Sequence, residues 1–197
     1  MKTHYKQSIT SLLLAAICMV PVTAQADSGS ANSASPSVAV DLDFRVVIPS
    51  ILRFRVGTDT PCSIDEVLFE PAAGDIGTGN DVTATSNGTV TVSIFSNAGQ
   101  ITITPTNDGS GNGLNNGTPT ENIPYSEILV SESEAAFANP TLSNAGGAAD
   151  ATMPTPTSGN NKVTNYPSET WSYLYDNTTE YPAGAYTGTV TYTATTP

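Results

Sequence analysis

The sequence predicts an all-β protein folded as a single antiparallel β-sandwich. Several short stretches alternate apolar and polar residues with a period of two, which is typical of strands with one buried face. Turn residues, mainly Gly, Asn and Pro, separate these stretches. No stretch of useful length has the apolar period of an amphipathic helix. Short alternating strands joined by polar turns are typical of a sandwich.

The first candidate strand runs from Val38 to Ile48. Apolar residues occupy every second position, so an extended chain here has one apolar face. This face consists of Val38, Val40, Leu42, Phe44, Val46 and Ile48. The strand pairs either within its own sheet, where these residues are core, or with a neighbouring chain by β-strand addition. The alternation leaves both interpretations open.

The clearest later strands lie between Val82 and Thr104. Asn87-Gly88 separates two alternating stretches, and this pair tolerates the positive φ angles of a two-residue hairpin turn. We therefore expect a three-strand meander over residues 82–86, 89–95 and 100–104. Further strands are expected at 52–56, 67–69, 125–130, 170–175 and 185–194, with one helical turn at 132–138 and an irregular connection at 139–165.

The N-terminal residues have the pattern of an export signal. Residues 1–26 combine Lys2 and Lys6 with an apolar core and a small-residue cleavage site, so we expect a signal peptide. Residues 27–37 form a flexible tether, and residues 38–197 form the β-sandwich domain. We expect export to the periplasm, the cell surface or the medium, with no transmembrane segment.

The charge and the residue types narrow the function classes. A net charge of −12 argues against nucleic acid as a partner, because the phosphate backbone is also negative. The single histidine, His4, lies in the expected signal peptide, so a mature protein would have no histidine for catalysis or zinc binding. Cys62 would have no partner in its own chain. We expect no enzymatic activity.

One loop resembles part of a calcium site. Asp108, Ser110 and Asn112 place oxygen ligands at alternate positions, with Gly113 at the sixth, as in the first half of an EF-hand loop. The twelfth position is Pro119 instead of a bidentate Glu. A plain turn-rich loop without a cofactor is therefore favoured, and Ca²⁺ binding is the alternative.

A row of aromatic residues gives a second candidate binding site. Trp171, Tyr173 and Tyr175 lie on one face of a predicted strand. If that face is exposed, the rings could stack on sugars, as in a secreted carbohydrate-binding module. Burial between sheets is the favoured interpretation, because large aromatic side chains dominate protein cores.

The C-terminal sequence Pro182-Ala-Gly-Ala-Tyr-Thr-Gly-Thr-Val190, followed by Thr-Tyr-Thr, resembles the closing strand of exported bacterial surface proteins. The nearest pattern is that of spore-coat-U-like pilins of the archaic chaperone–usher pathway, with WxL surface domains as a weaker match. The resemblance implies an Ig-like sandwich that lacks one strand, which the N-terminal segment of a neighbouring subunit supplies. Val38–Ile48 is similar to such a donor segment. Archaic pilins commonly carry a cysteine pair, whereas Cys62 is alone here.

The resemblance and the residue patterns together predict a non-enzymatic structural or adhesive protein of the cell surface. As a fimbrial subunit it would assemble with identical or related subunits by β-strand addition, and an export chaperone would be a partner. The alternative is the secreted carbohydrate-binding module, with or without Ca²⁺. A solitary periplasmic protein is a third possibility.

Overall fold

The computed structural model describes residues 28–58, 64–108 and 111–197. The expected signal peptide lies outside these residues, as do Cys62 and Ser110. The chain divides into two units, one ending at Ile48 and the other spanning Pro49–Pro197, and each is described by itself. The described residues form antiparallel strands and only short helical turns, so the predicted all-β class is confirmed.

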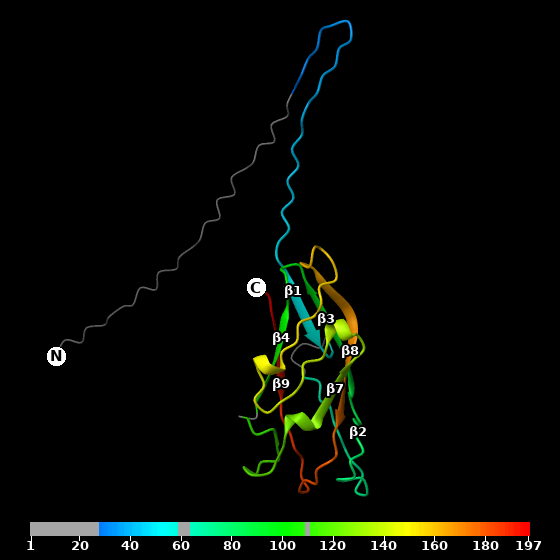
Figure 1. The fold of residues 1–197 in the computed structure, drawn as a ribbon, viewed down its shortest axis with the longest axis vertical. Helices are drawn as coiled ribbons and strands as arrows, with labels where there is room; N and C mark the ends of the chain where they lie inside the picture. The colour runs from blue at the N-terminus through cyan, green and yellow to red at the C-terminus, as the bar shows by residue number, and fades with distance from the viewer. Residues whose placement is uncertain (1–27, 59–63, 109–110) are drawn as a thin grey trace, which may run out of the picture. The chain divides into compact units, whose positions relative to one another are not determined.

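The larger sheet of the Pro49–Pro197 unit is antiparallel throughout. Its strands are ordered β1 (Leu52–Val56), β3 (Thr89–Ser96), β8 (Thr164–Tyr175) and β2 (Val82–Thr83), and β7 (Ile128–Glu132) also pairs with β8 (Figure 1). β3 pairs on both sides, and its apolar residues at alternate positions form one buried face.

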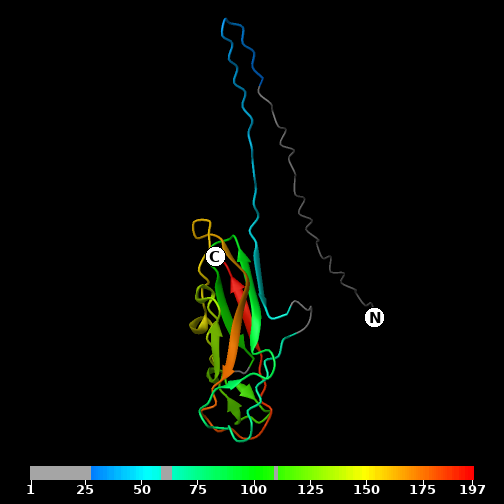
Figure 2. The same cartoon turned by 90° about the vertical axis from the view of Figure 1, so that its right-hand side faces the viewer.

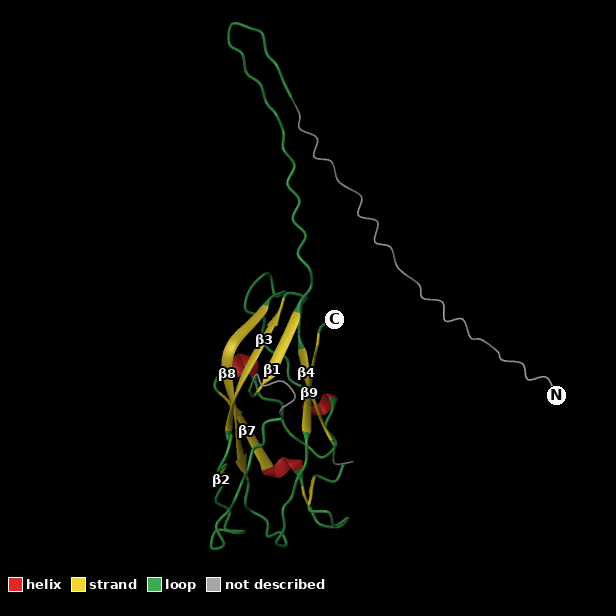
Figure 3. Ribbon diagram, turned by 180° about the vertical axis from the view of Figure 1, so that it is seen from behind, coloured by secondary structure: helices red, strands yellow, loops and turns green. Residues whose placement is uncertain are grey.

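The second sheet pairs β4 (Thr102–Asn107) with β9 (Val190–Thr195), in antiparallel register. Its strands run along the same long direction as those of the larger sheet (Figure 2). A small third sheet pairs β5 (Leu114–Asn115) with β6 (Asn122–Ile123). In the described part of the chain, three short 3₁₀ helices lie in the connections (Figure 3), and one of them matches the predicted helical turn. They are η1 (Tyr125–Glu127), η2 (Ala135–Phe137) and η3 (Ala148–Asp150).

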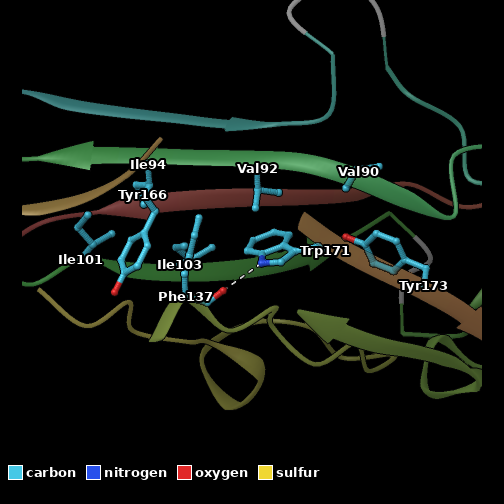
Figure 4. Close-up of a cluster of buried hydrophobic side chains, with 9 residues drawn as sticks. All are labelled: Val90, Val92, Ile94, Ile101, Ile103, Phe137, Tyr166, Trp171 and Tyr173. Atoms are coloured by element: carbon cyan, nitrogen blue, oxygen red, sulfur yellow. Dashed lines mark hydrogen bonds between the residues drawn. The ribbon is translucent and has the colours of Figure 1, made fainter. Parts of the chain in front are cut away.

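The hydrophobic core lies where side chains of the two sheets meet. Val92 of β3, Ile103 of β4 and Trp171 of β8 are each fully buried in one cluster (Figure 4). The Trp171 indole Nε1 donates a hydrogen bond to the Phe137 carbonyl oxygen at 3.2 Å, which ties β8 to η2. The Tyr192 ring of β9 lies 5.3 Å from the Trp171 ring, between centroids. Trp171 therefore connects β8, η2 and β9.

The predicted three-strand meander is wrong in its pairing. Asn87 has the expected positive φ of 52°, but Gly88 does not have the positive φ that the predicted two-residue turn also requires. β3 pairs with β1 and β8, and β4 pairs with β9 in the other sheet. Burial decides the partners, because the inner residues of β3 and β4 pack in the same core from different sheets.

The first candidate strand does not form a strand. Residues 38–48 have no secondary structure, and their apolar side chains are exposed, from 47% at Val38 to 87% at Phe44. The expected buried face is therefore absent from this unit, because alternation alone cannot hold an extended chain without a neighbouring strand to satisfy its backbone.

Candidate functional site

The Pro49–Pro197 unit contains a groove of about 1180 Å³. The groove is lined by β1 and β9, by residues 64–71 and by the inner residues of β8. Its apolar lining includes Phe54, Val56, Phe69, Tyr173, Val190 and Tyr192. An apolar groove of this size fits a peptide segment or a similar apolar ligand.

Two strand edges border this groove. Phe54, Arg55, Val56 and Gly57 line it as consecutive residues, and so do Val190, Thr191 and Tyr192. Side chains of consecutive strand residues point to opposite faces, so it is the edge of each strand that borders the groove. Within the described residues β1 pairs only with β3, and β9 pairs only with β4. Each strand therefore presents one unpaired edge, which is a template for another strand.

Three buried or half-buried tyrosines line the groove, and we call them its floor: Tyr173, Tyr175 and Tyr192. They are uncharged at neutral pH. The hydroxyl groups of Tyr173 and Tyr192 lie 3.1 Å apart, and burial raises the pKa of both phenols. Burial also raises the pKa of Tyr175, to about 12. These phenols stay protonated over the physiological range, so they offer the groove apolar rings and neutral hydrogen-bonding groups.

Charged residues also line the groove. Asp65, Glu66 and Glu70 belong to the lining segment 64–71. The Asp65 carboxylate accepts a hydrogen bond from the Thr58 hydroxyl at 2.9 Å, and this bond joins the segment to the end of β1. Arg55 of β1 lines the same groove.

The aromatic row of β8 does not form an exposed platform. Trp171, Tyr173 and Tyr175 have exposed fractions of 0%, 7% and 8%. The favoured interpretation, burial in the core, is therefore confirmed. These rings do not offer an exposed surface for stacking on sugars, because they are buried against other rings: the Phe137 ring lies 5.4 Å from the Trp171 ring and the Phe69 ring 6.3 Å from the Tyr175 ring.

Asp108, the first residue of the calcium-like loop, is hydrogen-bonded to other parts of the fold. Asp108 Oδ1 accepts hydrogen bonds from the Thr189 backbone N–H at 2.9 Å and from the Tyr125 hydroxyl at 3.2 Å. The bond from the Thr189 backbone is the main cause that lowers the pKa of Asp108. Ser110 is outside the described residues, and Asn112 is exposed. No group of three His, Cys, Asp or Glu residues that could hold a metal occurs in the part of the chain described.

The sequence alone does not reveal the groove. Its two strand edges come from opposite ends of the Pro49–Pro197 unit, and each looks like an ordinary alternating strand in the sequence. The one signal in the sequence was the apolar face of Val38–Ile48. This face predicts a binding partner, but it does not indicate where on the protein the partner surface lies.

Comparisons with family models, with curated proteins and with solved structures gave no match for this chain. Among the described residues, no helix has the length and apolar character needed to cross a membrane.

Proposed function

We propose that the protein is a non-enzymatic structural subunit that assembles with copies of itself by β-strand addition. The Val38–Ile48 segment of one chain occupies the groove between β1 and β9 of the next. One observation carries this proposal: the same chain has an exposed, alternating apolar segment and a separate apolar groove bordered by unpaired strand edges. The segment has no neighbouring strand to pair with, and the groove has strand edges and an apolar lining that an added strand would cover.

Backbone hydrogen bonds would supply one part of the affinity. The edges of β1 and β9 present N–H and C=O groups, and an inserted strand would pair with them. Apolar burial would supply the other part, since six side chains leave water. At roughly 1.5–3 kcal/mol each, their gross contribution is of order 10 kcal/mol, before the entropy lost on association is subtracted.

An export chaperone and a surface location belong to the same proposal. A subunit with an open apolar groove exposes surface that would aggregate before assembly. A chaperone that covers the groove during export would prevent this, and the export signal expected in residues 1–26 supports that route. The assembled subunits would form a fimbrial or adhesive structure.

Matched substitutions on the two faces of the segment test the proposal. Phe44→Asp places a charge on the apolar face, whereas Val47→Asp places the same charge on the opposite face. Both side chains are exposed, at 87% and 73%, so neither change disturbs a packed core. Light scattering after size-exclusion chromatography should show polymers for the full-length wild type and for Val47→Asp, and monomers for Phe44→Asp.

A synthetic Val38–Ile48 peptide provides the complementary measurement. It should bind to the monomeric Phe44→Asp protein, whose groove is intact. The proposal is wrong if the wild type is monomeric at every concentration and the peptide does not bind.

A further inference from the structure

Asn97 fixes the chain immediately before β1. Its Oδ1 accepts a hydrogen bond from the Ile51 backbone N–H at 2.8 Å, and its Nδ2 donates to the Pro49 carbonyl oxygen at 2.8 Å. The Asn97 backbone N–H donates to the Ile51 carbonyl oxygen at 3.3 Å. Leu52 of β1 already pairs with Ser96 of β3, so the Asn97 amide extends this pairing beyond the end of the strand.

These bonds restrain the only residues between the segment and the domain. Residues 49–51 separate Val38–Ile48 from β1. A chain that placed its own segment beside the unpaired edge of β1 would have to reverse direction within them, and a loop of this length suffices for a hairpin. Asn97 instead holds Pro49 and Ile51 in line with β1.

The geometry points to Asn97 as a clamp that keeps Val38–Ile48 out of the groove of its own chain and so directs it to a second copy. This inference rests on the proposed function and adds a reason why the segment binds the groove of another copy and not the groove of its own chain. Such a preference needs a physical cause. A segment tethered by a short linker acts at millimolar effective concentration on its own groove, which exceeds the concentration of other subunits. Without a restraint, a closed monomer would outcompete assembly.

The test compares full-length wild type with Asn97→Ala, which removes both side-chain hydrogen bonds. The control is Asn165→Ala. This exposed asparagine of β8 pairs with Phe95, near the end of β3 that precedes Asn97. Light scattering gives the monomer fraction, and hydrogen exchange reports whether the amides of residues 38–48 are protected. Asn97→Ala should raise the monomer fraction about tenfold, and residues 38–48 should be protected in that monomer. The control should behave like the wild type.

A second variant leaves the folded unit unchanged. Inserting Gly-Asn-Gly between Ile48 and Pro49 places a turn before the clamp, so it should give the same protected monomer even if Asn97→Ala does not fold. The clamp is overturned if this insertion variant polymerises as the wild type does, without a protected monomer. It is also overturned if wild-type monomers already protect residues 38–48. Failure of the proposed function looks different: no polymer, no protection and no peptide binding in any variant.

Discussion

Truncating Phe44 in the synthetic peptide should weaken its binding to the groove far more than truncating its neighbour Val47. Phe44 is 87% exposed in the free segment, so almost its whole side chain is available for burial. Full burial of a phenylalanine contributes about 2 kcal/mol, and Phe44→Ala should therefore raise the Kd about 30-fold. Val47 lies on the opposite face of an extended chain, so Val47→Ala should change the Kd less than about threefold.

Isothermal titration of the two variant peptides into the monomeric Phe44→Asp protein measures both effects. The groove-lining residues of this variant protein are unchanged, and its own Val38–Ile48 segment, which carries the charge introduced by Phe44→Asp, should not compete with the peptide for the groove. If the two substitutions weaken binding equally, the segment does not bind as a strand with one inward face. If neither substitution matters, the groove does not bind these side chains at all.

Three further outcomes are expected from the fold. Trp171→Phe should lower the free energy of unfolding by about 2 kcal/mol in urea, since it leaves the buried Phe137 carbonyl unpaired; an unchanged midpoint would contradict this. Because burial raises the pKa of Tyr175 to about 12 from 10.0, the unfolded chain ionises first, so the contribution of Tyr175 to stability should be constant below pH 10 and fall between pH 10 and 12. Tyr175→Phe should make that fall shallower in thermal melts. Gly188→Ala should lower the melting temperature, because its Cβ would lie 2.2 Å from a tyrosine hydroxyl oxygen, whereas Gly74→Ala, with open space around it, should not.

Some strands were predictable, because the period of two is a local property, but the strand expected at 67–69 is only an isolated bridge at Leu68, and the first part of the one expected at 125–130 is η1. The alternation at Leu52–Val56 and at Thr89–Phe95 matches β1 and β3, within one residue at the end of β3. The first half of β8 was missed: residues 164–165 fell in the expected irregular connection and residues 166–169 were assigned to no strand, since Pro167 and polar neighbours hide a strand there. Which strands pair was not predictable, because pairing depends on burial between distant segments.

Of the candidate site, only the apolar face of Val38–Ile48 was predictable from the sequence. The groove requires β1 and β9 to approach without pairing, and no pattern within either strand indicates this. Asn97 shows the same limit. In the sequence it is one asparagine in the turn Asn97-Ala-Gly99, and only the fold reveals that its amide binds Pro49 and Ile51.

The charge pattern of the segment explains how a strand could find one register in the groove. Asp41, Asp43 and Arg45 all lie on the face opposite Phe44. In the proposed register they would remain in water, while the apolar face covers the neutral tyrosines of the floor. A slip of one residue would turn the charges onto that floor, and burying an unpaired carboxylate is strongly unfavourable. Only slips of two residues keep the faces in place.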